Sequence, residues 1–250
     1  MPVWAQAGLW GLLASSSLVI GAALAYVVDL PRRVTAGIMA FGCGVLISAV
    51  AYDLIMEGFQ LGGIWPIVSG AVAGSLAYTA ANLLVSTRGG KHRKRSGTQQ
   101  ADQGGEASGL VIAVGSLLDG IPESIVLGVG LVGGGGVSVA MLAAIFLSNL
   151  PEGLSSAAGM KQAGRSKTHV LGMWGGIAVL TAGASLCGAG LFANASPWLL
   201  AMVNAMAAGA LLTMIADTMI PEAVEGEHDG TGTLVVLGLL VAFALSQGGG

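Results

Sequence analysis

Charged side chains are scarce in this sequence of 250 residues, of which only 9% are Asp, Glu, Lys or Arg. Soluble globular domains usually carry about 25% of such residues, which keep their surfaces in contact with water. Aromatic residues are also few, at 5%, whereas 54% of the residues are hydrophobic and 42 are glycine. This composition excludes a water-soluble globular domain. It indicates a membrane protein, in which abundant glycine allows helices to pack closely.

Cysteine and histidine are nearly absent as well. The two cysteines, Cys43 and Cys187, both fall in apolar runs, and their spacing gives neither a disulfide framework nor a zinc finger. None of the three histidines lies within an apolar run, so an intramembrane serine hydrolase would have no histidine base. An aspartyl hydrolase built from Asp53 and Asp217 is the remaining enzymatic option, and no other feature supports it. We therefore expect no enzyme.

Long apolar runs dominate what is present. A run of about 20 residues can cross a bilayer as a helix. Weak alternation of apolar and polar residues disfavours barrel strands, which need only about ten residues each. We expect an all-α integral membrane protein in which residues 1–250 form a single transmembrane domain. The eight predicted spans are about Leu9–Val28, Thr35–Met56, Ile64–Val85, Leu110–Leu131, Val137–Met160, Val170–Leu191, Trp198–Ile220 and the shorter Leu234–Leu245.

Positive charges predict the orientation of these spans. All ten Lys and Arg residues fall in three loops, around Arg33, in 88–95 and around Arg165. With eight helices, these loops lie on one side, which the positive-inside rule makes cytoplasmic. We expect a multi-pass protein of the cell (inner) membrane with both termini outside. The segment 87–108 is basic and then rich in Gly, Gln and Ser, which predicts a mobile cytoplasmic loop.

An internal repeat links helices that cross in opposite directions. The fourth span contains LLDGIPESIVLG and the fifth contains FLSNLPEGLSSA. The second and seventh, GVLISAVAYDLIMEG and GALLTMIADTMIPEA, match more loosely, and chance similarity between Gly- and Ala-rich helices is the alternative there. Such a pattern predicts an inverted repeat of three, two and three helices. In transporters this arrangement places the substrate site at mid-membrane.

Acidic residues within the spans carry the chemistry. They are Asp53, Asp119, Glu123, Glu152 and Asp217, and no Lys or Arg occurs at the same depth. Ionisable groups inside a membrane are costly and usually functional. Crowded carboxylates in a low dielectric take up protons unless a cation accompanies them. The sequence therefore leaves two options, a divalent cation permease and a proton-coupled transporter of another small solute.

Spacing places several of these groups on common helix faces. Asp119 and Glu123 are four residues apart, Ser148 and Glu152 repeat that interval, and Asn149 lies beside the second pair. Residues at this interval share one face of a helix. Two such faces turned toward each other can form a cage of oxygen ligands for a metal.

A proline precedes three of the glutamates. Each of these prolines removes one helical hydrogen bond and frees the carbonyl four residues earlier. A freed carbonyl within a membrane needs a partner, for which a cation, water or a Ser or Asn side chain would serve. The prolines are Pro122, Pro151 and Pro221, and the carbonyls belong to Leu118, Leu147 and Asp217.

Three segments resemble the signatures of a transporter family. IPES within LLDGIPES, SNLPEG and DTMIPEA are similar to segments of the ZIP (Zrt/Irt-like) divalent metal transporters, and the likeness extends over nearly the whole chain. The resemblance implies a metal site between the second, fourth, fifth and seventh helices, from which metal passes toward the cytoplasm. The metal is then the substrate. No cofactor and no nucleic-acid partner is expected beside the lipid bilayer, and a homodimer is left open.

The resemblance also implies individual ligands. Glu123 and Glu152 match the family's glutamates, whereas Asp119 and Ser148 stand where histidines are usual. Oxygen ligands suit manganese better than zinc, which prefers nitrogen and sulfur. We therefore expect zinc, cadmium, manganese or iron as substrate, without strict zinc selectivity. Gly120 replaces a usual asparagine and the sixth span has no acid, which disfavours a second metal site. The implied ligands are Asp119, Glu123, Ser148, Asn149, Glu152, Asp53 and Asp217.

Overall fold

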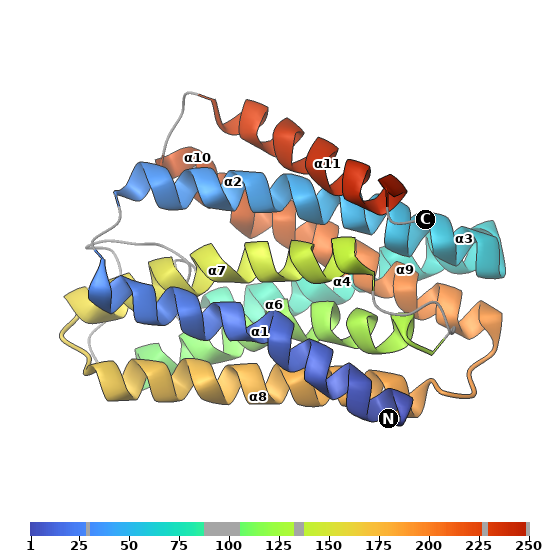
Figure 1. Ribbon diagram of the computed structural model, residues 1–250, viewed down its shortest axis with the longest axis horizontal. Helices are drawn as coiled ribbons and strands as arrows, with labels where there is room; N and C mark the ends of the chain where they lie inside the picture. Colours follow the sequence, from blue (N-terminus) through green and yellow to red (C-terminus); the bar gives the residue numbers. More distant parts are fainter. Residues whose placement is uncertain (29–30, 88–105, 133–137, 227–229, 249–250) are drawn as a thin grey trace.

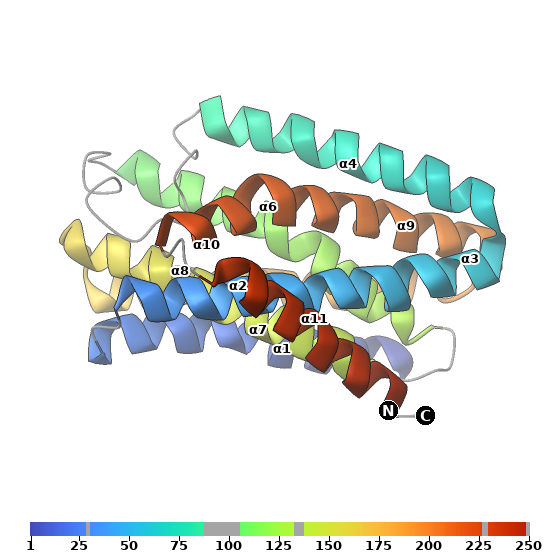
Figure 2. The same cartoon turned by 90° about the horizontal axis from the view of Figure 1, so that it is seen from above.

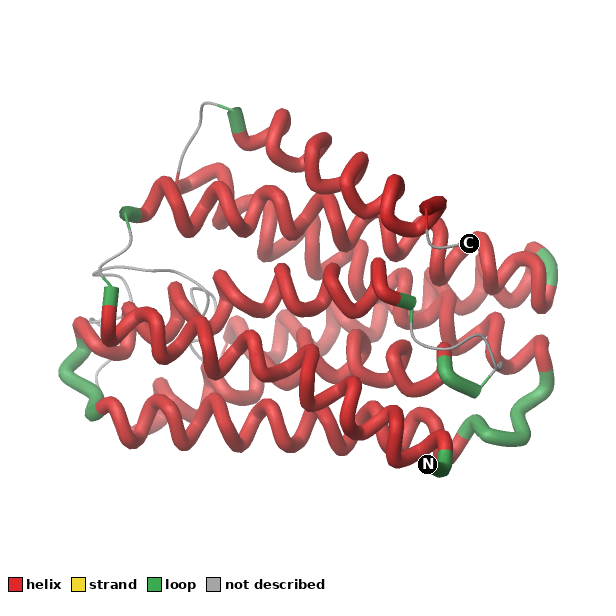
Figure 3. Tube along the Cα trace, viewed as in Figure 1, coloured by secondary structure: helices red, strands yellow, loops and turns green. Residues whose placement is uncertain are grey.

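The computed structural model describes residues 1–28, 31–87, 106–132, 138–226 and 230–248, and every regular element among them is helical (Figure 3). Two long helices each contain a π-helical segment, in which an extra residue widens one turn. The first runs through α2, η1 and α3, and the second through α9, η3 and α10. The elements are α1 (Val3–Val27), α2 (Arg32–Ala49), η1 (Val50–Met56), α3 (Glu57–Gly62), α4 (Ile64–Thr87), α6 (Glu106–Gly130), α7 (Val139–Gln162), α8 (Lys167–Leu191), α9 (Pro197–Met214), η3 (Ile215–Met219), α10 (Ile220–Gly226) and α11 (Thr231–Gly248).

Six helical segments within the described residues are long and apolar enough to cross a membrane. They are Val3–Val27, Arg33–Gly62, Ile64–Val85, Ala113–Gly130, Lys167–Leu191 and Pro197–Glu225. Large apolar side chains cover the outside of the bundle; Trp65 and Leu191 are each 79% exposed. Apolar surface on this scale is unsuited to water, so the structure fits an all-α, multi-pass membrane protein.

The remaining two predicted spans are helical but are less apolar or shorter than the other six. The fifth predicted span coincides with α7, whose buried Ser148, Asn149 and Glu152 make it less apolar than its neighbours. The eighth predicted span lies in α11, whose apolar part is shorter, Thr231–Ser246. The predicted all-helical class is therefore confirmed, while the structure supplies six rather than eight clear membrane-crossing segments.

The helices run along the long axis of the molecule, and α1 begins at the same end at which α11 finishes (Figure 1). α2 and α8 begin at the opposite end, where Arg33 and Lys167 lie. At this end the Lys161 ammonium donates to the Ala25 carbonyl at 3.1 Å, which ties α7 to the last turn of α1. The predicted loop 87–108 lies largely outside the described residues, and its last part, 106–108, belongs to α6 rather than to a loop.

The helices form two groups. In one, α1 packs on α7 and α8, and α6 packs on α8; in the other, α4 packs on α9 and α2 on α11 (Figure 2). Glycines allow the closest of these contacts. A Cβ atom at Gly153 of α7 would overlap the Leu18 carbonyl oxygen of α1, and one at Gly21 of α1 would overlap the Leu150 carbonyl oxygen. Close backbone approach of this kind is typical of helices packed in lipid.

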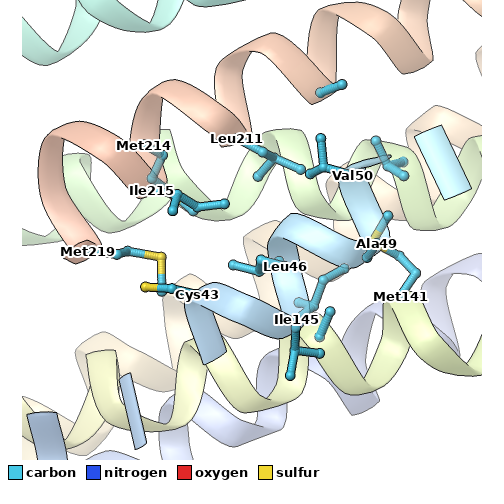
Figure 4. Close-up of a cluster of buried hydrophobic side chains, with 14 of the residues drawn as sticks. Cys43, Leu46, Ala49, Val50, Met141, Ile145, Leu211, Met214, Ile215 and Met219 are labelled. Atoms are coloured by element: carbon cyan, nitrogen blue, oxygen red, sulfur yellow. The ribbon is translucent and has the colours of Figure 1, made fainter. Parts of the chain in front are cut away.

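The two groups meet where α2 packs against α7 and α6 against α9. The contact between α2, α7 and α9 is a cluster of buried apolar side chains that point toward one another (Figure 4). Its centre includes Leu46 and Val50 of α2 and η1, Ile145 of α7 and Leu211 of α9. Because the middle of α7 lies beside this cluster, the polar residues on α7 are held at a fixed position within the bundle.

Candidate functional site

Five of the buried polar side chains on α6 and α7 are residues that the sequence predicts as metal ligands. They form the α6–α7 polar cluster, and each is at most 6% exposed: Asp119, Glu123, Ser148, Asn149 and Glu152. These are five of the seven residues that the sequence predicts as metal ligands. The structure thus places them all in the interior, on two of the three helices that carry Pro-Glu segments.

A hydrogen bond joins the two helices within the cluster. The Ser148 hydroxyl lies 3.4 Å from the Glu123 carboxylate oxygen Oε1 and 3.0 Å from the Ile145 carbonyl oxygen. Its single proton is shared between these two acceptors. Asp119 and Glu152 each lie one helical turn, about 6 Å of axial rise, from Glu123 and Ser148 respectively. The predicted facing of the two polar faces is thus met at the contact between Glu123 and Ser148.

Tyr78 extends the cluster to a third helix. Its hydroxyl, on α4, donates to the Asp119 carboxylate oxygen Oδ1 at 2.5 Å, and the side chain is only 3% exposed. A hydrogen bond from a hydroxyl to an ionised carboxylate is short and strong, so it fixes the direction in which Asp119 points. The sequence analysis missed Tyr78. A signal was available, because a tyrosine in the middle of an apolar span needs a partner for its hydroxyl.

Backbone features position the two glutamates. Pro122 and Pro151 lie inside α6 and α7, and both helices continue through them. Each proline removes the amide that would have bonded the carbonyl four residues earlier. The residue after Glu152 is Gly153, whose backbone abuts α1 at Leu18. Glu152 is therefore held between a proline turn and a helix contact that leaves no space for a Cβ atom.

The other two predicted ligands lie apart from the cluster. Asp53, on η1, accepts a hydrogen bond at 2.6 Å from the hydroxyl of Ser138, the residue that caps α7. Ser148 is farther along α7 by about 15 Å at 1.5 Å per residue. Asp217, on η3, is exposed. Asp53 and Asp217 thus remain predictions as ligands.

The ligand types available restrict what the cluster can hold. Among the described residues, no three His, Cys, Asp or Glu side chains are grouped closely enough to bind a metal ion. A cation at the cluster would therefore also need the Ser148 hydroxyl, the Asn149 amide oxygen, a backbone carbonyl or water. Such ligands are the hard oxygen donors that Mn²⁺ and Mg²⁺ accept readily. His169 is exposed at the start of α8, and the other two histidines lie outside the described residues.

No family model matches the chain, and no curated protein matches it. What the chain does is therefore inferred from the chemistry of the cluster and from its position among apolar helices.

Proposed function

We propose that this chain is a ZIP-like transporter that carries a divalent metal cation across the membrane toward the cytoplasm. One observation carries the proposal: the carboxylates of Asp119, Glu123 and Glu152 are each buried on α6 and α7, and the Ser148 hydroxyl of α7 lies 3.4 Å from the Glu123 carboxylate of α6. The described Lys and Arg residues lie toward the ends of helices, away from this depth. Buried carboxylates require a cation or a proton to balance their charge.

The donor set favours a particular class of metal. All five cluster residues offer oxygen, and none offers nitrogen or sulfur as a ligand. Manganese and iron accept oxygen ligands readily, while zinc and cadmium bind carboxylates but prefer softer ligands. We propose manganese or iron as the preferred substrate, with zinc and cadmium also carried.

An inverted repeat of three, two and three helices would allow one helix group to move against the other during transport. In that arrangement α1 corresponds to α8, α2 to α9, α4 to α11 and α6 to α7. The packing of the helices supports it, because α1 on α7 then corresponds to α8 on α6, and α4 on α9 to α11 on α2. The two π segments, η1 and η3, also fall on corresponding helices, and each carries one aspartate. Motion of one helix group against the other would expose the cluster to each side in turn.

Charge distribution sets the proposed orientation. We place the protein in the cell (inner) membrane with the end that carries Arg33 and Lys167 in the cytoplasm and both termini outside. Metal would then enter at the end where Ser138 and Asp53 lie, reach the cluster, and leave past the loops at the basic end. Asp53 would be the first carboxylate on this route.

Metal uptake by proteoliposomes tests the proposal. Purified protein is reconstituted, and uptake of Mn, Fe, Zn, Cd and Mg is measured for the natural chain and for Glu123→Gln, which keeps the shape but removes the charge. The exposed Glu225 supplies the matched control, Glu225→Gln. We expect uptake of Mn and Fe that falls by at least about tenfold, or ~1.4 kcal/mol, in Glu123→Gln and is unchanged in Glu225→Gln.

The alternative, proton-coupled transport of another small solute, makes a different prediction in the same vesicles. Carboxylates then act as a proton relay, so no metal would be taken up, and Glu123→Gln would abolish proton movement instead. Failure of every metal to enter, with both variants folded, would overturn the metal proposal in favour of this one.

A further inference from the structure

A cavity of about 490 Å³ lies between α4, α6 and α9, and Phe192, just past the end of α8, also lines it. Its walls are apolar apart from Tyr78, whose hydroxyl is engaged by Asp119. The volume falls in the range of roughly 300–1,000 Å³ that small-molecule sites occupy. The cavity is separate from the α6–α7 polar cluster, whose residues are absent from its lining.

The cavity opens toward the apolar outer surface of the bundle. Ala77 and Met206 line it and are exposed, and Leu76 beside Ala77 is 65% exposed. Both lie in segments that are long and apolar enough to cross a membrane. The opening therefore faces the hydrocarbon interior of the membrane. Water would bind weakly in this cavity, because it needs several polar partners. An empty cavity would lose dispersion contacts along its walls.

We propose that this cavity binds one hydrocarbon chain of a membrane lipid, with the headgroup remaining outside. The lining contains no charged residue and no unengaged hydroxyl among the described residues, so nothing in it would recognise a headgroup. It extends from Phe192, beyond the end of α8, to Leu118 near the middle of α6. This shape, apolar throughout and open to the membrane, suits a flexible chain.

A bound chain would lie between the two helix groups. α4 packs closely on α9 but only weakly on α6, and the cavity occupies the space between them. Leu118 and Pro122 of its wall immediately precede Asp119 and Glu123 in the chain. The hydrocarbon chain would therefore fill the space between α4 and α6, beside the hydrogen bond from Tyr78 to Asp119. It would support the contact between these two helices from the membrane side.

Photochemical labelling tests the site without measuring transport, so its result is independent of the proposed function. The full chain is reconstituted with phosphatidylcholine that carries a diazirine at mid-chain, irradiated, and digested for mass spectrometry. Ala77→Phe fills the cavity. The matched control is Ala80→Phe, because Ala80 is also exposed and lies three residues along α4 but outside the lining.

We expect adducts on the lining segments of α4, α6 and α9 to fall about tenfold in Ala77→Phe and to be unchanged in Ala80→Phe. Ala81→Leu, which also fills the cavity, carries the same test if Ala77→Phe does not fold. Adducts spread evenly over all outward helix faces, or equal labelling in the filled variants and the control, would overturn the proposal.

Discussion

At the scale of single residues, the hydrogen bond from Tyr78 to Asp119 shows how the site differs from one built on histidine. A histidine ligand holds its own orientation through its second ring nitrogen, whereas a carboxylate is oriented by its donors. Here the donor is a phenol on a neighbouring helix, 2.5 Å away and buried. Asp119 is thereby kept directed toward α4 unless a cation competes with Tyr78 for its carboxylate.

Removal of the phenol oxygen should weaken both folding and transport. Tyr78→Phe keeps the ring but leaves the buried Asp119 carboxylate without this donor, which should cost about 1–3 kcal/mol of stability and lower metal uptake. Thermal unfolding in detergent and uptake by proteoliposomes measure the two effects. Tyr52 is exposed and its ring lies tilted against that of Phe243, with the ring centroids 5.0 Å apart, so Tyr52→Phe provides the control. Equal stability and uptake in the two variants would refute a role for the Tyr78 hydroxyl.

The metal preference should follow the ligand at position 148. The Ser148 hydroxyl lies 3.4 Å from the Glu123 carboxylate, so Ser148→His introduces a nitrogen ligand beside Glu123. Because zinc prefers nitrogen ligands, we expect the ratio of zinc to manganese uptake to rise about tenfold. Competition between the two metals for uptake measures the ratio, with Ser148→Ala as the control for loss of the hydroxyl. An unchanged ratio in a variant that still transports would show that position 148 does not contact the metal.

At the scale of helices, α7 has both buried polar residues and a close contact with α1. It must lie inside the bundle, although it carries polar residues, and it must approach α1 closely at Gly153. Gly153→Ala should therefore destabilise the protein by about 1–3 kcal/mol, since its Cβ would overlap the Leu18 carbonyl oxygen.

The matched control for this prediction is Gly175→Ala on α8, where an added Cβ meets nothing within 4 Å. Alanine favours a helix over glycine by about 1 kcal/mol, so this change should be neutral or slightly stabilising. Denaturation midpoints in one detergent compare the two. A Gly153→Ala midpoint as high as that of Gly175→Ala would mean that α1 and α7 are not in close contact there.

Much of the helical layout could be predicted, because apolar length and loop charge are local properties of the sequence. Each predicted span lies largely on helical residues, and Asp119, Glu123, Ser148, Asn149 and Glu152 are buried on two of these helices. The π segments were not predicted, since a widened turn depends on packing between helices rather than on composition. The same holds for the partners of Asp53 and Asp119, which are Ser138 and Tyr78, because the fold alone brings these residues together.

At the scale of the whole molecule, the direction of transport depends on which end faces the cytoplasm. Gln162 at the end of α7 and Asn194 after α8 are both exposed and lie at opposite ends of α8. We expect a cysteine in place of Asn194 to react with an impermeant maleimide in intact cells, and one in place of Gln162 only after permeabilisation. Cys43 and Cys187 are first replaced by alanine. The reverse labelling pattern would invert the proposed topology.

α6 and α7 carry the buried carboxylates of Asp119, Glu123 and Glu152, whose charge a cation can balance. Binding of Mn²⁺ to the purified protein in nanodiscs, followed by electron paramagnetic resonance, tests this most directly. The account predicts saturable binding that is lost when Glu123 and Glu152 are both changed to glutamine and retained in Glu225→Gln. Equal Mn²⁺ binding by the double variant and the control, or none by the natural chain, would contradict it.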